Sequence, residues 1–471
     1  MMKSRRFPMF LVLLYTLTAC LFAAGCGDDD NNTVGGPAWY DPTWAVSTDV
    51  LQPVRDLRII RGIIHAHSLF SHDACDNKPL CNPECLKQFR EALCTTRQDY
   101  IMLTDHDDHF AEYEFPEVLL YDPDSGDELL FDGEERPVAN RIFCGDGTFS
   151  TLMAGTENDL MPVHLHQHPE GSIEDRFALY DRDDPAVIDV FHELGASVFV
   201  NHSEEWSAEE LVALAPDGIE IFNLHAAIAP NLRPNLGVGS LDFIIDLLPF
   251  LFDAEKPEPN LAMMTFWPCT TAWTDRWDAL LGVQRCVGIT ATDVHRNALP
   301  FPLSDGERAD GYRRMMQFFS NHILVAEEDP ALIEEAIDMG RLYAAFEYLG
   351  MPEGFDFHMT DGGFTWEMGD EAELAGGLTI RIARPAAYAI DPLGPQPEIS
   401  MRLIRVDGGG STIVTESDDD IVYPVDAAGA YRAEVRIVPH HLEPFLGSDP
   451  ARYIHEYPWI YANPIYVMAD S

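Results

Sequence analysis

The sequence predicts an α/β fold with a largely parallel sheet, followed by a smaller all-β domain. From about residue 56 to residue 350, short apolar runs rich in β-branched residues alternate with segments of helical spacing, a pattern typical of strands joined by crossover helices. After residue 351, strand-like runs lie between Gly, Asp and Pro clusters, and helical spacing is rare. The first pattern predicts a barrel-like closure of the sheet, and the second predicts a small sandwich.

Each element has its own signal in the chain. Strands are expected at the β-rich runs 58–65, 100–104, 196–201, 218–223, 284–290, 378–382, 398–406, 412–414 and 431–438. Helices are expected where a capping residue, an early proline or a capping box precedes apolar residues at helical spacing. These helices begin near residues 82, 184, 207, 240 and 329. Gly195 and Gly340 are expected to end two of them.

The first 25 residues predict export. Three basic residues precede an apolar stretch, 10–24, that is too short to predict a membrane span. Small residues stand directly before Cys26 and a run of Asp and Asn follows it, which resembles the lipobox of bacterial lipoproteins. Lipid on Cys26 would anchor the protein in the bacterial cell envelope, in the periplasm or at the cell surface. Cys20 is a rival lipidation point, and an ordinary secretion signal is the alternative.

Four parts of the chain follow from these signals. Residues 1–25 are the leader, 26–55 a tether and lead-in, 56–350 the α/β domain, and 351–471 the β-rich domain.

The charge balance excludes one class of partner. The chain has 79 acidic residues against 30 basic ones, a formal net charge of -49. Such a surface repels the phosphates of DNA and RNA, so no nucleic-acid partner is expected. The sequence gives no indication of the oligomeric state.

The cysteines suggest disulfides. Cys75, Cys81, Cys85 and Cys94 form a tight group, which in an exported protein predicts at least one disulfide. A structural zinc site is the alternative. Without Cys20 and Cys26 the number of cysteines is odd, so at least one thiol stays free.

Residues that can bind metals recur at the carboxyl ends of the expected strands. His65 and His67 end the first strand, and alternate residues of a strand share a face, so both imidazoles can reach one ion. Further strand ends carry Asp105 with His106, Glu157, Asn201 with His202, and Asp293 with His295. Imidazole and carboxylate without thiolate suit Zn, Mn or Fe, and a bridging carboxylate can hold two ions.

Other candidate residues are interpreted as structural or solvated. Glu220, inside the strand 218–223, is expected to be an ion-pair acid. The histidines in this group are His109, His168, His192, His225, His322, His440 and His441.

Five motifs, in the same order, resemble those of the polymerase and histidinol phosphatase (PHP) superfamily. They are His65-Ala66-His67 with Asp73, Leu103-Thr104-Asp105-His106, Ala154-Gly155-Thr156-Glu157, Val200-Asn201-His202 and Asp293-Val294-His295. The resemblance implies a distorted (β/α)7 barrel that holds two or three divalent ions.

The resemblance also implies a set of metal ligands. They are His65, His67, Asp73, His106, Glu157, His164, His202, Asp293 and His295. Glu157 would bridge two ions, and Asp73, where some members of the family have histidine, would belong to a third position. His166 and His168 compete with His164, which best fits the family's strand position.

Two C-terminal segments refine the expected activity. Residues 339–344 and 459–467 resemble the PHP branch that includes carbamate-ester (carbaryl) hydrolases, which carry a β-domain after the barrel.

The expected reaction is hydrolysis of a small-molecule phosphoester by a metal-bound hydroxide. Either Asp293 or His295 is expected to pass the proton to the leaving group, and Arg296 is a candidate anion clamp. A carboxylic or carbamate ester is the alternative substrate, and a cell-envelope binding protein with structural metals is the alternative of another class.

Overall fold

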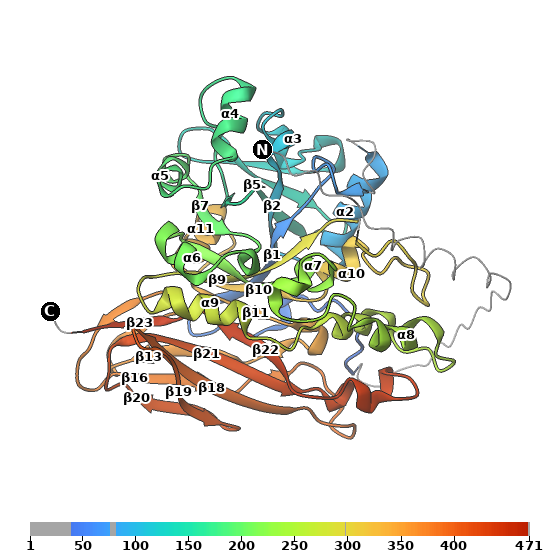
Figure 1. Cartoon of the computed structure of the whole chain (residues 1–471), viewed down its shortest axis with the longest axis vertical. Helices are drawn as coiled ribbons and strands as arrows, with labels where there is room; N and C mark the ends of the chain where they lie inside the picture. The colour runs from blue at the N-terminus through green and yellow to red at the C-terminus, as the bar shows by residue number, and fades with distance from the viewer. Residues whose placement is uncertain (1–38, 76–81, 297, 470–471) are drawn as a thin grey trace. The chain divides into compact units, whose positions relative to one another are not determined.

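The computed structural model describes residues 39–75, 82–296 and 298–469, which form a mixed α/β structure with one large sheet (Figure 1). The mixed α/β class is therefore confirmed. The leader, Cys26 and Cys81 lie outside the described residues. Within them, no helix is both long and apolar enough to cross a membrane.

Parallel strands form the centre of the large sheet: β1 (Arg58–Ala66), β2 (Tyr100–His106), β5 (Phe149–Glu157), β7 (Ser197–Val200), β8 (Gly218–Asn223) and β9 (Val287–Val294). β1 pairs with β2 and β9, β2 pairs with β5, and β8 pairs with β7 and β9. Their residues are almost all buried, which explains the continuous apolar runs in the sequence. Because these strands are parallel, their carboxyl ends lie at one edge of the sheet. The (β/α)7 barrel stays a prediction.

One short strand runs in the opposite direction. β6 (Met161–Val163) pairs antiparallel with β7, and Val163 lies opposite Ser197, the first residue of β7. The residues that follow β6 therefore lie at the amino end of β7, away from the edge where the parallel strands end.

Further antiparallel strands extend the sheet: β3 (Glu128–Phe131), β4 (Pro137–Phe143), β10 (Ser320–Val325) and β11 (Leu342–Ala345). β10 pairs with β1 and β11, and β4 pairs with β3 and β5. These strands were not expected from the sequence. They are short, and pairing with chain segments distant in sequence stabilises them more than their own residue pattern does.

The helices are α2 (Pro83–Thr95), α3 (Asp107–Phe110), α4 (Ile173–Tyr180), α5 (Pro185–Glu193), α6 (Ala208–Leu214), α7 (Leu224–Ile228), α8 (Ile244–Phe252), α9 (Ala272–Leu281), α10 (Tyr312–Met316) and α11 (Pro330–Met339). Most expected starts are confirmed. Asn82, Asp184 and Asp329 cap helices that begin with proline, and Ser207 forms a capping box with Glu210. α8 begins four residues later than expected and has no side-chain cap at its start.

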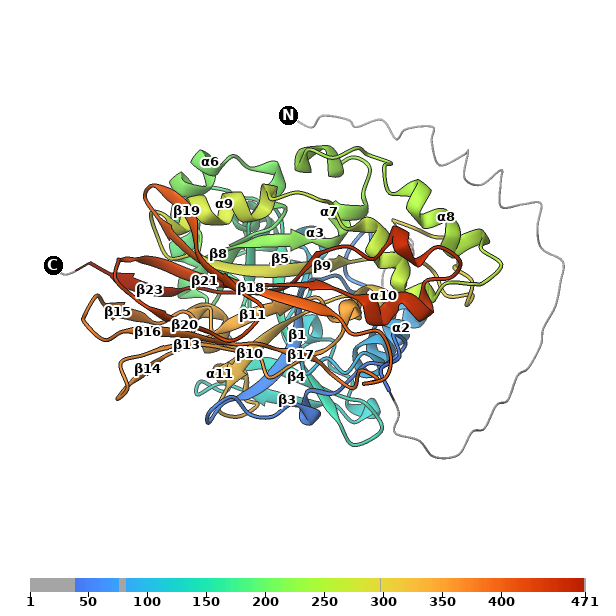
Figure 2. The same cartoon turned by 90° about the horizontal axis from the view of Figure 1, so that it is seen from below.

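Strands fill the region after residue 351: β12 (Pro352–Glu353), β13 (Asp356–Thr360), β14 (Thr365–Trp366), β15 (Glu371–Glu373), β16 (Thr379–Ala383), β17 (Ala386–Ala387), β18 (Glu398–Asp407), β19 (Gly410–Ser417), β20 (Ile421–Pro424), β21 (Gly429–Val438), β22 (Tyr457–Ala462) and β23 (Ile465–Met468). One four-stranded sheet has the order β14-β13-β16-β20, and it lies beside β18 and β21 in Figures 1 and 2. β22 pairs with β11, so this β-rich region continues the large sheet.

Two disulfides link the region around α2. Cys75 bonds to Cys85, which confirms a disulfide within the cysteine group, and Cys94 bonds to Cys144 outside that group. Within the described residues Cys269 and Cys286 are free cysteines, in agreement with the expectation of at least one free thiol.

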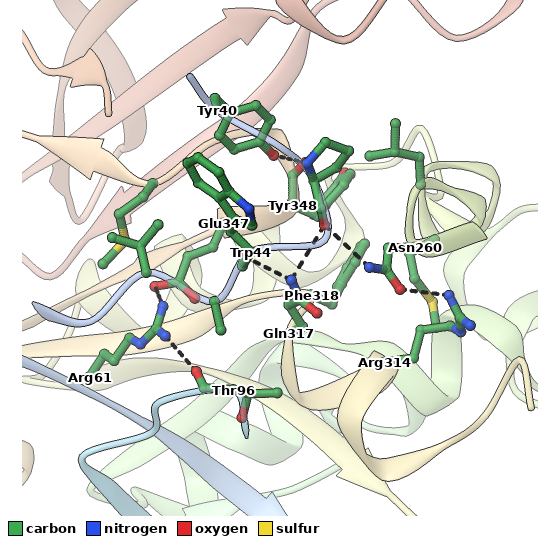
Figure 3. A pocket seen from close by; sticks show the side chains of 16 residues that line it. Tyr40, Trp44, Arg61, Thr96, Asn260, Arg314, Gln317, Phe318, Glu347 and Tyr348 are labelled. Atoms are coloured by element: carbon green, nitrogen blue, oxygen red, sulfur yellow. Dashed lines mark hydrogen bonds and ion pairs between the residues drawn. The ribbon is translucent and has the colours of Figure 1, made fainter. Parts of the chain in front are cut away.

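The first described residues pack against the body of the protein (Figure 3). The carbonyl of Pro42 accepts hydrogen bonds from the side chains of Asn260 and Gln317. The cavity beneath this segment has a volume of about 20 Å³, room for about one water molecule. It is too small for an organic substrate.

A buried ion-pair network lies at the edge of this cavity, next to the start of β1. The Glu347 carboxylate is 2.8 Å from Nη1 of Arg61 and 2.7 Å from Nε2 of His322. Burial raises the pKa of Glu347, but the charge of Arg61 and the hydrogen bond from His322 outweigh it and lower the pKa to about 2. Because this pKa is depressed in the folded protein, the ionised carboxylate stabilises the fold at neutral pH.

Glu347→Gln is expected to lower the free energy of unfolding by about 3 kcal/mol at pH 7. Because the pKa of Glu347 is lowered in the folded protein, its contribution to stability is complete above about pH 4.5 and is lost as the pH falls toward 2. The difference between wild type and variant should therefore shrink over that range in urea unfolding followed by tryptophan fluorescence. Glu371→Gln, which breaks an exposed pair with Arg285, serves as control and should cost less than about 1 kcal/mol. A difference that does not change with pH would contradict this role of Glu347.

Candidate metal centre

Histidines and carboxylates meet at the carboxyl ends of the parallel strands. They follow or end β1, β2, β5, β7 and β9, and contacts between their side chains are 3.1 to 3.8 Å long. We call this set the main cluster: His65, His67, Asp73, His106, Glu157, His202, Asp293 and His295. Of the predicted ligands, only His164 lies elsewhere within the described residues.

Glu157 lies at the centre of the main cluster, and its two oxygens face different histidines. Oε1 is 3.2 Å from Nε2 of His65 and 3.5 Å from Nε2 of His202. Oε2 is 3.2 Å from Nε2 of His67 and 3.4 Å from Nδ1 of His106. A carboxylate in this position can bridge two ions, each held by one group of histidines.

Asp293 also presents its two oxygens to different partners. Oδ1 lies 3.1 Å from Nε2 of His67 and 3.2 Å from Nε2 of His295. Oδ2 lies 3.2 Å from Nε2 of His202, and it accepts a hydrogen bond of 3.4 Å from the amide of Asn223. Asp293 therefore connects the part of the cluster around His67 with the part around His202.

His65 and His202 each bind a carboxylate outside the main cluster through Nδ1, the ring nitrogen that points away from the cluster. Nδ1 of His65 is 2.5 Å from Glu220, and Nδ1 of His202 is 2.9 Å from Glu204. A carboxylate can only accept, so Nδ1 carries the hydrogen and Nε2 faces the cluster. Histidines that bind metals typically donate the other ring N–H in this way, which fixes ring orientation and tautomer.

Asp105 fixes the ring of His67 through a serine. It accepts hydrogen bonds from the backbone N–H of Ser68 and from Oγ of Ser71, at 2.6 and 2.9 Å. Oγ of Ser71 is in turn 2.7 Å from Nδ1 of His67. Asp105, from the second of the five motifs, thus holds the ring of His67, from the first motif, in place.

Three residues of the main cluster have a left-handed backbone. φ is 69° at His65, 44° at His202 and 46° at Asp293, a conformation that costs residues with a Cβ roughly 1–2 kcal/mol each. At His65 the pairing of β1 with β9 also shifts register, as happens where a bulge turns a side chain at an active site. Such strain at the ends of three strands is typical of a functional site.

The electrostatics of the main cluster favour positive charge. Burial would lower the pKa of His65, but the charges of Glu157 and Asp293 outweigh burial and raise it to about 10. Burial would likewise raise the pKa of Glu157 and Asp293, but the charge of His65 holds both well below their usual range. The carboxylates therefore stay ionised only while cations balance them. Without a metal these cations are protons on the imidazoles, so metal binding would release protons.

The chemistry of the residues fits a divalent metal ion. Nitrogen and oxygen atoms of His65, His67, Glu157 and Asp293 lie within 4.8 Å of one another, and all four residues are buried. Within the described residues, some buried polar atoms here have no hydrogen-bond partner, namely Oδ1 of Asp73, Oδ1 of Asn201, Nδ1 of His225 and Nδ1 of His295. Imidazole and carboxylate donors without thiolate suit Zn, Mn or Fe.

His164 is not part of the main cluster, which corrects the placement expected from the sequence. It follows β6, and β6 is antiparallel to β7, so His164 lies at the opposite end of the sheet. There, Nε2 is 2.8 Å from Asp338. His166 contacts Glu334, and Nε2 of His168 lies 2.7 Å from the carbonyl of Tyr113.

Glu220 is an ion-pair acid, as expected from the sequence, and its partner is His65; His225, which was interpreted as structural or solvated, also lies beside the site. Glu220 orients His65, and the ring of His225 lies 4.2 Å from that of His295 between centroids. Burial and the charge of His295 lower the pKa of His225 to about 3, so this imidazole is neutral at pH 7. His225 comes two residues after the end of β8, and the strand-end rule applied to β8 could have found it.

Arg296 follows His295 directly and is partly exposed. Nη1 of Arg296 donates a hydrogen bond to Oε1 of Gln88 on α2, and the backbone carbonyl of Arg296 accepts a hydrogen bond from the guanidinium of Arg308. The guanidinium of Arg296 is thus held against α2.

Similarity to known proteins is low. No protein-family model matches the chain, and no curated protein matches it. Among solved structures, the chain is similar to a two-domain protein containing a predicted PHP-like metal-dependent phosphoesterase from Bacteroides vulgatus, at 13% sequence identity and a TM-score of 0.30. The similarity covers 87% of this chain and 96% of that chain. Inference about function therefore rests on the residues of the site.

Glu220→Gln is expected to weaken metal binding about 10–100-fold, because the neutral amide keeps one acceptor oxygen where Glu220 uses two, for the ring of His65 and for the N–H groups of His202 and Asn223. Competition with a chelator measures the affinity, and melting temperature checks the fold. Asp217→Asn removes a carboxylate from another His–carboxylate pair, with His192, and should leave metal affinity in the main cluster unchanged. Equal affinities in wild type and Glu220→Gln would contradict the orienting role.

Proposed function

We propose that this protein is a metal-dependent hydrolase of ester bonds, with phosphoesters as its preferred substrates. The observation that carries the proposal is the position of Glu157 and Asp293: both oxygens of each carboxylate face histidines, and these histidines come from different strand ends. Such an arrangement suits two or three divalent ions that share ligands, and metal pairs of this kind are typical of phosphatases and related hydrolases.

The residues have distinct expected roles. Bound divalent ions would lower the pKa of water from about 15.7 to about 7 and stabilise negative charge on the ester. Asp293 would accept a hydrogen bond from the attacking water and so orient it. Nε2 of His295 lies 3.2 Å from Oδ1 of Asp293, close enough to move a proton between Asp293 and the leaving group. Arg296 would bind the anionic end of the substrate.

The finer assignment is a (β/α)7 barrel of PHP type, in the branch that includes carbamate-ester hydrolases. Five motifs in the order of that family support it, as does the β-rich region that follows residue 351. Membership in this branch would favour carboxylic or carbamate esters as the alternative substrates.

Three esters that share the leaving group 4-nitrophenol test the function. The metal-depleted full chain is supplied with Mn, Zn or Fe and given 4-nitrophenyl phosphate, 4-nitrophenyl acetate and a 4-nitrophenyl carbamate. We expect metal-dependent hydrolysis that is fastest for the phosphate. Faster cleavage of the acetate or carbamate would overturn the substrate class. A metal-loaded protein that cleaves none of them would overturn the catalytic function and favour a metal-containing binding protein.

Asp293→Asn should lower turnover about 10²–10⁴-fold, because the amide cannot accept a proton from water. Metal content is expected to fall partly, and the fold to stay intact, because the substitution keeps the size of the side chain. Asp278→Asn is the matched control: this buried carboxylate pairs with Arg432, away from the main cluster. It should lower the melting temperature without lowering turnover per folded molecule. Full turnover of metal-replete Asp293→Asn would contradict the proposed role.

We also propose that the protein is exported and held in the cell envelope by lipid on Cys26. The support is the sequence before and after Cys26. Cys26→Ser should move the protein from the membrane fraction to the soluble fraction, measured by fractionation of cells. Release by Cys20→Ser alone would assign the anchor to Cys20.

A further inference from the structure

A second group of metal-binding side chains lies at the opposite end of the large sheet. It consists of His164 and His166, which follow β6, and Glu334 and Asp338 on α11; we call it the second cluster. Because β6 is antiparallel to β7, the two histidines lie near Ser197 at the amino end of β7. Glu334 and Asp338 are four residues apart, so they project from one face of the helix.

The geometry of the second cluster brings nitrogen and oxygen donors together. Donor atoms of His164, His166 and Glu334 lie within 4.8 Å of one another. Nε2 of His166 is 3.1 Å from both oxygens of Glu334, and Nε2 of His164 is 2.8 Å from Oδ1 of Asp338. His164 is only 2% exposed, and its backbone has a φ of 46°.

Both ring nitrogens of His164 face acceptors. Nδ1 lies 2.9 Å from the carbonyl of Gly195, and a carbonyl can only accept, so Nδ1 carries a hydrogen. Nε2 faces the Asp338 carboxylate, which also accepts a hydrogen bond from Ser197. A neutral imidazole has only one N–H. The position of Nε2 therefore requires a cation, either a second proton on the ring or a metal ion.

We propose that the second cluster binds one divalent metal ion of the zinc type, with His164, His166, Glu334 and Asp338 as its ligands. Two imidazoles and two carboxylates make a four-coordinate set suited to Zn²⁺. The Nδ1–H of His164 donates to the Gly195 carbonyl, the backbone contact that typically orients a metal-binding histidine. Asp338 also lines a cavity of about 350 Å³, through which an ion can enter.

The role of this ion is structural. The second cluster lies at the amino end of the parallel strands, where residues contribute to stability and not to the reaction. A metal here would join α11 to the segment after β6, and through Ser197 and Asp338 to β7. The proposal is independent of the hydrolase function, because it shares no residue with the main cluster.

Glu334→Gln and Glu335→Gln form a matched pair for the test. Both remove one negative charge from the same helix, but Glu335 is exposed and pairs only weakly, at 3.6 Å, with Arg341. Metal-depleted full chain is dialysed against Zn²⁺, and bound zinc is counted by atomic emission. Glu334→Gln should bind one equivalent less than wild type and lose part of the zinc-dependent rise in melting temperature. Glu335→Gln should match wild type in both.

His166→Gln is the second variant and should lose the same equivalent of zinc. Anomalous diffraction at the zinc edge should give a peak between His164 and Glu334. Equal zinc content in wild type, Glu334→Gln and His166→Gln, with no peak there, would overturn the proposal and leave two His–carboxylate ion pairs. Glu157→Ala should remove zinc from the main cluster without affecting this peak, so the proposals for the two clusters can be tested independently.

Discussion

Glu157 and Asp293 are carboxylates that are only 4% and 1% exposed, and the arrangement of the rest of the site depends on how their charge is balanced. Burying an ionised carboxylate is costly unless a cation and hydrogen bonds compensate it. Histidines at four strand ends, those of β1, β2, β7 and β9, supply that compensation. The pKa values of His65, His67, His106 and His202 are raised and those of the two carboxylates are lowered, so these histidines and carboxylates keep one another ionised. Divalent ions would satisfy the same requirement with fewer protons and stronger bonds.

The fold provides this convergence at a cost. Parallel strands bring their carboxyl ends to one edge of the sheet, but a regular strand end does not aim His65, His202 and Asp293 at a common point. Their left-handed backbones redirect the side chains, and the hydrogen bonds of His65 to Glu220 and of His202 to Glu204 hold the rings in place. Backbone strain at three neighbouring strand ends, together with the buried polar contacts that hold their side chains, indicates selection for a function of that edge.

Much of the site could be predicted from the sequence because strand ends have a clear local signal. The apolar runs that end at His65, His106 and Glu157 are long enough to be recognised, and polar residues after them are conspicuous. The position of His164 could not be predicted, because nothing local shows that the three-residue strand β6 runs antiparallel. The pairing of Cys94 with Cys144 and the strands β10 and β11 also depend on contacts between distant segments. His225 lies two residues after the end of β8, as His202 does after β7, so the same strand-end rule could have found it.

The most direct test of metal binding by Glu157 is an anomalous diffraction map of the metal-loaded protein, measured at the absorption edge of the bound metal. If Glu157 bridges ions held by the two groups of histidines, the map will show at least two peaks about 3.5–4 Å apart, one beside each oxygen of Glu157. Absence of any peak among the histidines at the carboxyl ends of β1, β2, β7 and β9 would contradict metal binding by the main cluster. It would mean that protonated imidazoles alone balance the two buried carboxylates.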